Sequence, residues 1–150
     1  TDADAEQLFP VMALLEGRCA AEATLRASAQ DVLHLQRLHD QLERHAAAAD
    51  ADGYYVANHE FHSHVQQLAA NRWLDRATGD LRRFLRLWRG RQLQLPGRLA
   101  ASINEHRVLL DAIVQRDAMR AERAMHDHLM AQLAALKALQ LRESHRRRHG

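Results

Sequence analysis

The chain of 150 residues is 47% hydrophobic and 27% charged, with a formal net charge of +2, which is typical of one globular domain with a single core. Six glycines and two prolines are too few for the turns of a β-sandwich or barrel, and no apolar run approaches the about 20 residues of a membrane helix. Cys19 is the only cysteine, which excludes an intramolecular disulfide and a cysteine-based zinc cluster. No signal peptide opens the chain, so we expect a cytoplasmic protein without a membrane partner.

In chain order, apolar periodicity and helix breakers predict six amphipathic helices. The first covers about residues 4–27. The second begins at Ser28, where Asp31 three residues later is typical of a capping box, and it fades near Ala49. The sequence Asp-Ala-Asp-Gly at residues 50–53 predicts a turn before the third helix, which carries apolar residues as far as Ala69.

The fourth helix is predicted to begin after Asn71, a residue typical of helix N-caps, and to end at Pro96–Gly97. The fifth covers about residues 99–113, and Asp117 is expected to cap the sixth, which continues to about Leu139. The expected inner stripe of the fourth helix consists of Leu74, Ala77, Leu81, Phe84, Leu85 and Trp88. Because short loops between long helices favour antiparallel neighbours, we predict an all-α fold, an antiparallel helical bundle.

Residues 142–150 are a basic tail with four arginines and one glutamate, and we expect this tail to be disordered and solvated. Residues 1–141 then carry 17 basic and 18 acidic residues. The sequence pI of about 9.2 therefore comes from the tail, and the body of the chain is not a basic platform for nucleic acid.

The chain contains eleven histidines, a large number for its length. Three of them, His62, His106 and His128, fall on the apolar stripes of the third, fifth and sixth helices. The other eight are predicted on polar faces or in the tail: His34, His39, His45, His59, His64, His126, His145 and His149.

The spacing of the inward histidines predicts that they meet. His106 and His128 each lie eleven residues from Asp117, so an antiparallel hairpin that turns there places both rings at one level, about 16 Å from the turn. Asn58 and His62 are four residues apart and share one face of the third helix. Two interpretations remain open. Either each ring has its own buried partner, or all converge on a metal such as Zn, Ni, Cu or Fe.

Four stretches together resemble the FCD domain, the C-terminal effector-binding domain of the FadR branch of GntR-type transcriptional regulators. They are Asn58–His62, Ala69–Leu74, Glu105–Ile113 and Asp117–Leu129, and their order and spacing agree with the family pattern over almost the whole chain. The resemblance implies an antiparallel bundle of six to seven helices, with residues 1–141 forming the effector-binding domain.

The resemblance also implies a divalent metal, zinc or nickel, held by an Asp or Asn and three histidines. These roles fall on Asn58, His62, His106 and His128. A small carboxylate metabolite is expected beside the metal. It would modulate DNA binding by an N-terminal winged helix that this chain lacks, consistent with a first residue that is Thr1 rather than Met. A homodimer is expected as well.

Two positions depart from the family pattern. Asn58 stands where an Asp is common, so the ligand set brings no negative charge and is expected to favour an anionic effector. Met12 stands where the family often has an Arg, four residues before Glu16. Another group must then hold an effector carboxylate, and the candidates on the fourth helix are Arg89, Arg91 and Gln92. Alternatively, the two arginines are solvated residues that flank the inner stripe of this helix.

An enzyme would need a general base beside the metal. We expect no carboxylate on the inner stripes, because Glu105 projects about 100° away from His106 around its helix. We therefore predict a sensor and not an enzyme. A metal-free helical dimerisation scaffold and, less favoured, a metal-dependent hydrolase remain as alternatives.

Overall fold

The computed structural model describes residues 1–150 and contains only helices, so the predicted all-α bundle is confirmed. The six α-helices and one short 3-10 helix are α1 (Asp2–Arg26), α2 (Ala29–Ala47), α3 (Ala51–Leu68), α4 (Arg72–Arg91), η1 (Gln92–Gln94), α5 (Arg98–Val114) and α6 (Ala118–His149). None of them is both long and apolar enough to cross a membrane.

The predicted N-caps of three helices are confirmed. The Ser28 side chain accepts a hydrogen bond from the Asp31 backbone, and the Asp31 carboxylate accepts one from the backbone of Ser28, which is a capping box. Asn71 caps α4 and Asp117 caps α6 through their side-chain oxygens. These contacts lie within three residues along the chain, which is why the sequence alone locates these helix starts.

The prediction of a turn over residues 50–53 is wrong. Asp50 is the N-cap of α3, because its carboxylate accepts a hydrogen bond from the backbone N–H of Gly53. The reversal lies earlier, at Ala49, which has a left-handed backbone with φ 52°. A sequence rich in Asp and Gly is typical of a turn and also of the first turn of a helix. Here the hydrogen bond from Gly53 to the Asp50 side chain makes these residues the start of α3.

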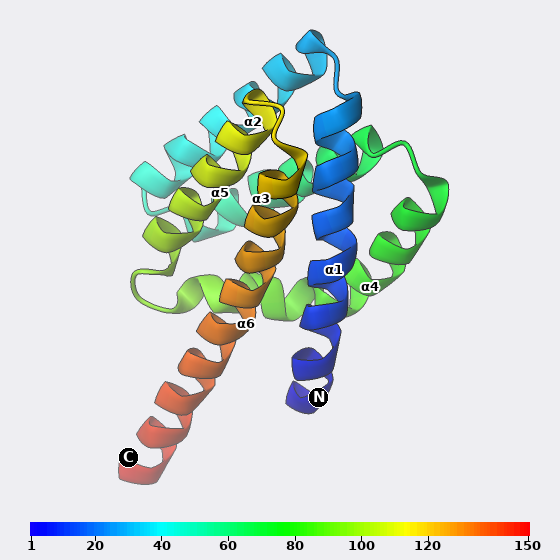
Figure 1. The fold of residues 1–150 in the computed structure, drawn as a ribbon. Helices are drawn as coiled ribbons and strands as arrows, with labels where there is room; N and C mark the ends of the chain where they lie inside the picture. The colour runs from blue at the N-terminus through cyan, green and yellow to red at the C-terminus, as the bar shows by residue number, and fades with distance from the viewer.

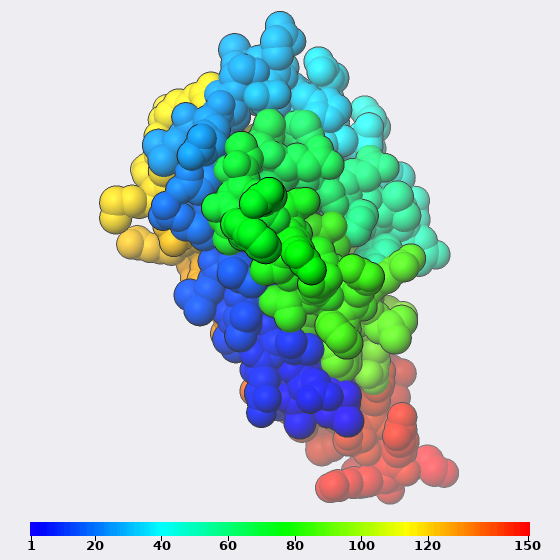
Figure 2. Space-filling model, turned by 90° about the vertical axis from the view of Figure 1, so that its right-hand side faces the viewer, coloured from blue at the N-terminus to red at the C-terminus, as the bar shows by residue number.

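The C-terminal tail is helical. Residues 142–149, which we expected to be disordered, continue α6, and most of their side chains are exposed. This end of the helix projects beyond the body of the bundle (Figures 1 and 2). The arginines and histidines of the last turns also stabilise a helix C-terminus, where the dipole favours positive charge.

The bundle is organised around α1 and α6, which lie side by side and antiparallel (Figure 1). α5 and α6 form the predicted hairpin, and α2 packs against α3 and α5. α4 extends to one side, and its second half crosses behind α1 and α6 in the view of Figure 1. The largest fully buried side chains are Phe9, Met12, Leu35, Leu42, Tyr54, Phe61, Leu85, Leu109, Ile113, Met125, Leu129 and Leu136.

The inner face of α4 differs from the predicted stripe. Phe84 is 69% exposed, whereas Thr78, Leu85 and Arg89 are the buried residues of this helix. Apolar residues alone predict the stripe that includes Phe84. Arg89 takes an inner position because a buried carboxylate on α1 faces it, and a helical stripe that includes Arg89 cannot also bury Phe84.

Candidate metal centre

Three imidazole rings from three helices meet inside the bundle. His62 of α3, His106 of α5 and His128 of α6 are each at most 1% exposed. One ring nitrogen of each lies within 4.8 Å of those of the other two. The ring centroids are 5.2 Å apart for His62 and His106, 5.3 Å for His62 and His128, and 4.6 Å for His106 and His128.

The α5–α6 hairpin sets the level of two of these rings. The chain reverses just before Asp117, and the equal distance of His106 and His128 from that residue brings their rings into contact. His62 reaches the same point from α3 and stacks on His128 with an interplanar angle of 16°. The inward positions of these histidines follow from the apolar residues around them on each helix.

Asn58 lies one helical turn before His62 and joins the cluster. Its Oδ1 accepts a hydrogen bond of 2.7 Å from Nε2 of His106, and the residue is 8% exposed. The structure thus brings together the four residues that the resemblance assigns to a metal.

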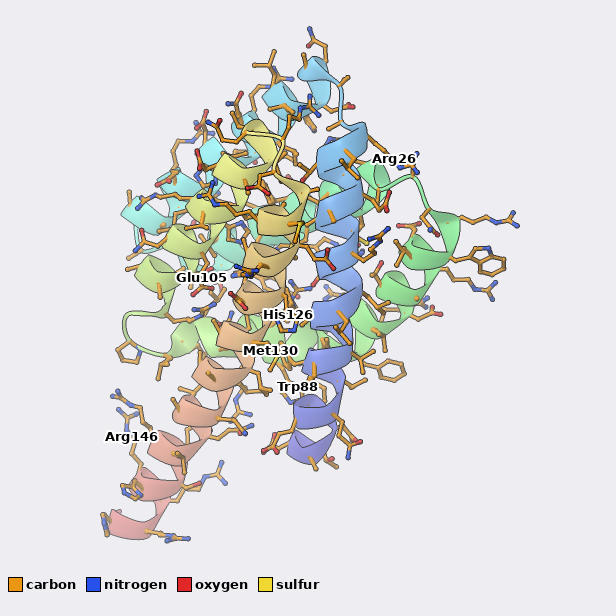
Figure 3. All side chains as sticks on the ribbon, viewed as in Figure 1. Arg26, Trp88, Glu105, His126, Met130 and Arg146 are labelled. Atoms are coloured by element: carbon orange, nitrogen blue, oxygen red, sulfur yellow. The ribbon has the colours of Figure 1, made fainter.

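Two carboxylates also reach the cluster, and our expectation that none would is wrong. Nδ1 of His62 donates to Oε1 of Glu16 at 3.2 Å, and Nδ1 of His128 donates to Oε1 of Glu105 at 2.6 Å. Figure 3 shows Glu105 between α5 and α6. Successive residues of a helix point about 100° apart, which turns Glu105 away from His106, but the neighbouring helix α6 packs against α5 and its His128 meets Glu105 there.

Glu16 could have been recognised from the sequence. It lies four residues after Met12 and three before Cys19, two residues on the buried stripe of α1, so its carboxylate had to be buried too. A fully buried carboxylate requires a partner of opposite charge or several hydrogen bonds. Glu16 also accepts a hydrogen bond of 2.7 Å from Nε2 of Gln66.

The hydrogen bonds to the carboxylates orient two of the rings for metal binding. When Nδ1 carries the proton, the lone pair of Nε2 is free, and metal-binding histidines commonly have this arrangement with a carboxylate behind the ring. Nε2 of His62 and Nδ1 of His106 are buried without any hydrogen-bond partner. Nε2 of His128 accepts a hydrogen bond of 3.2 Å from Gln132. Because unpaired buried nitrogens are costly, these residues fit a divalent metal ion.

Burial keeps the imidazoles neutral, as metal ligands must be. It lowers the pKa of His62 to about 4, although Glu16 opposes this shift. Burial also lowers the pKa of His106 and of His128. For Glu16, burial acts to raise the pKa, but Arg89 and His62 together hold it at about 2.

Each carboxylate has one arginine beside it. Nη1 of Arg89 lies 3.6 Å from Oε2 of Glu16. Arg98 binds Glu105 through two parallel hydrogen bonds of 2.7 and 2.8 Å. The two guanidinium groups therefore offset the two carboxylates, and the surroundings of the histidines carry no excess negative charge.

The three predicted effector residues, Arg89 and Arg91 of α4 and Gln92 of η1, separate in the structure. Arg89 is 6% exposed and lines a cavity of about 560 Å³ between α3 and α4 that Asn58 also lines. Arg91 pairs instead with Glu143 of α6. Gln92 is buried and accepts a hydrogen bond from Arg98, so it supports the arginine behind Glu105.

The prediction of eight surface histidines is wrong for His39. This residue is 6% exposed, and its Nε2 lies 3.0 Å from a carboxylate oxygen of Glu43, one turn later on α2. Its burial follows from the adjacent Leu38 and from Leu35 and Leu42, which surround it on the inner side of the helix. His59 is exposed and His126 half-buried.

The chain is similar to known proteins in sequence and in structure. The family model described as FCD domain matches residues 7–131. Comparison of the sequence with curated proteins finds no match. The structure of E. coli McbR/YncC superposes with a TM-score of 0.78 and 18% identity, covering 89% of this chain and 68% of that one. For Streptococcus agalactiae GntR the TM-score is 0.77 with 24% identity, over 90% of this chain and 60% of that one. This chain shares their fold.

Proposed function

The chain belongs to the FCD domain family, the regulatory domains of GntR-type transcription regulators, and we propose that it senses a small organic acid through a divalent metal ion. The observation that carries the proposal is the convergence of three buried imidazoles from three helices, with ligand atoms within 4.8 Å of one another. Neutral imidazole suits zinc and nickel, and helical bundles hold metals with side chains of facing helices.

In this proposal the metal ligands are His62, His106, His128 and the side-chain oxygen of Asn58. Glu16 and Glu105 hold two of the rings in the tautomer that a metal requires. When bound, a divalent ion supplies a Lewis-acidic site of positive charge inside the bundle. The four ligands are all neutral, which keeps that positive charge available to an anion.

The effector in this proposal is a small molecule with a carboxylate. The charges of Glu16 and Glu105 are offset by Arg89 and Arg98, so the charge of the ion is the net charge of the site. Of the three predicted effector residues, the proposal keeps Arg89, which shares the cavity with Asn58. The proposal assigns Arg91 and Gln92 to structural contacts, because both have partners elsewhere.

Binding is converted into regulation if the effector prefers one arrangement of the helices. The proposed ligands lie on α3, α5 and α6, and Glu16 connects them to α1. An anion at the metal therefore acts on four helices together. We propose that the resulting change in the arrangement of these helices repositions a winged-helix DNA-binding domain carried N-terminal to α1, in a homodimer.

Metal analysis of the purified chain tests this function. Inductively coupled plasma and native mass spectrometry should find about one zinc or nickel per chain, and isothermal titration should then detect small carboxylates. The His106→Ala variant should lose the metal, whereas the matched His126→Ala variant should retain it. A wild-type chain that stays metal-free after incubation with zinc or nickel contradicts the proposal and favours the dimerisation scaffold.

The carboxylates of the site support the prediction that the domain is not an enzyme. Glu105 is bound by both His128 and Arg98, and Glu16 by His62 and Gln66. A general base must be free to accept a proton from the reacting group. A hydrolase that used Glu105 would have to break one of these contacts before each turnover, because donors occupy both of its oxygens.

A further inference from the structure

The cavity between α3 and α4 is bounded at one end by a close approach of the two helices. The two helices meet at Gly90, where an added Cβ would lie 3.3 Å from the ring of Tyr55. The Tyr55 hydroxyl also donates to the backbone carbonyl of Arg86 at 3.3 Å and closes this end. At the other end, a Cβ on Gly79 would meet nothing within 4 Å. Gly79 lines the cavity of about 560 Å³.

One wall of this cavity is a row of arginines. Arg82, Arg86 and Arg89 are four and three residues apart, so they share the face of α4 that lines the cavity, and we call them the arginine stripe. Glu60 is the only acidic residue of the lining. Arg83 lines the cavity as well, but its guanidinium is paired with Asp80. The cavity therefore has a surplus of positive charge.

The stripe also contains buried donors without acceptors. Arg89 is 6% exposed, and its Nη2 has no hydrogen-bond partner. Nε of Arg82 is buried and unpaired too, and its Nη1 reaches only Ser63 at 3.4 Å. Glu16 is the counterion of Arg89, but it leaves Nη2 of Arg89 and Nε of Arg82 without acceptors, and buried donors without acceptors are costly. A ligand with negative charge in the cavity would satisfy these donors.

The cavity borders the histidine cluster through Asn58, although none of the three histidines lines it. Asn58 lines the cavity and accepts a hydrogen bond from His106. Arg89 lines it as well and faces Glu16, the partner of His62. A molecule in this cavity can therefore approach a metal held by Asn58 with one end and contact the arginine stripe with the other.

We propose that the effector carries at least two anionic groups, one at the metal side of the cavity and a second bound by Arg82 and Arg86. The placement of the first anionic group rests on the proposed metal-binding function, whereas the placement of the second group does not. The second group is a carboxylate or a phosphate, because the planar guanidinium fork binds both with paired hydrogen bonds. The arginine stripe thus selects against acids with a single negative charge.

Calorimetric titration of the zinc-loaded chain with four probes tests this inference. Acetate and lactate carry one negative group, citrate carries several carboxylates, and phosphoglycolate carries a carboxylate and a phosphate. Citrate or phosphoglycolate should bind at least about tenfold more tightly than acetate and lactate, since each charged contact contributes to affinity. The stronger binder of the two identifies the second group as carboxylate or phosphate.

The Arg86→Gln variant tests whether the arginine stripe causes the difference in affinity between the probes. Arg86 is exposed, so its replacement leaves the hydrophobic core intact. It should weaken the tighter probe about tenfold and leave lactate within about twofold. Arg76→Gln, on the same helix but outside the cavity, should change neither. Equal affinity for singly and multiply charged probes overturns the inference, as does an Arg86→Gln variant that binds like the wild type or a zinc-loaded chain that binds none of the four.

The stripe can be tested apart from the metal. The chain is stripped with a chelator and dialysed, and inorganic phosphate is then titrated. Phosphate should bind the wild type and bind Arg86→Gln about tenfold more weakly. Absence of this difference overturns the inference. A chain that takes up no metal in the parallel analysis contradicts the proposed function instead, so the two failures are distinct.

Discussion

Glu16 and His62 are 46 residues apart in sequence, yet the carboxylate of the first accepts a hydrogen bond of 3.2 Å from Nδ1 of the second in the fully buried centre of the bundle. The contact joins α1 to α3 and connects to Arg89 of α4 through the same carboxylate. It orients one proposed metal ligand and neutralises a buried arginine. A single side chain on α1 therefore contacts both a proposed metal ligand and an arginine of the proposed effector cavity.

Replacing Glu16 with Gln should weaken metal binding about 10- to 100-fold, because outer partners of metal-binding histidines commonly have effects of this size. The amide keeps the shape of the side chain but removes the charge that holds Nδ1 of His62 protonated. Competition with a chromogenic chelator measures the affinity. Glu6→Gln, an exposed position on the same helix, should bind metal like the wild type; equal affinities for all three chains would contradict the role of Glu16.

The His106→Ala and His128→Ala variants should lose the metal and the stability that it provides. Metal at about 1,000 times its dissociation constant adds about 4 kcal/mol, and this corresponds to roughly 10 °C in Tm for a domain of this size. Differential scanning calorimetry with and without chelator separates this effect from the cavity that alanine leaves. The wild type should respond to chelator and the two variants should not.

His59→Ala and His126→Ala are the matched controls for this experiment. His59 is exposed, and His126 lies on α6 close to Gly17 of α1, away from the cluster. Both variants should keep the metal and the response to chelator. Equal losses in all four variants would show that the inward and outward faces are assigned incorrectly.

Asn58→Asp should bind metal more tightly and the carboxylate effector more weakly. The substitution preserves the size of the side chain and adds one negative charge next to His106. That charge attracts the cation and lowers the positive charge that an anionic effector meets. Chelator competition and calorimetry measure the two affinities. A variant in which both affinities rise would contradict the charge argument.

The metal-free chain should become less stable as the pH falls from 6.5 to 4. Burial lowers the pKa of His62 from its ordinary 6.5 to about 4, so between these values the unfolded chain holds a proton that the folded chain does not. Protons then favour unfolding, and this group alone removes on the order of 3 kcal/mol by pH 4. The lowered pKa values of His106 and His128 act in the same direction.

Urea denaturation between pH 8 and pH 4 after removal of metal measures this dependence. Below pH 4.5 the slope should continue, because the pKa of Glu16 is held at about 2 and its protonation also favours the unfolded chain. His62→Gln removes one titrating group and should flatten the upper part of the curve. A free energy of unfolding that is the same at pH 7 and pH 5 would contradict the buried, neutral state of the rings.

The helices and the inward histidines could be predicted because the signals for both are local. Ser28, Asn71 and Asp117 cap their helices through contacts within three residues. His62 and His128 point inward because apolar neighbours three or four residues away lie on the same face of the helix. The same local reasoning failed at Phe84 and His39, where the width and position of the buried face depend on which helices pack against it.

The sequence by itself thus determined the helical bundle, the three inward histidines and the position of Asn58 beside His62, since periodicity along one helix contains this information. Only the tertiary structure decided that Glu16 and Glu105 stand behind the rings and that Arg89 faces the interior. These contacts join helices that are far apart in the chain. Their geometry depends on the crossing and rotation of whole helices, which no spacing within a single helix encodes.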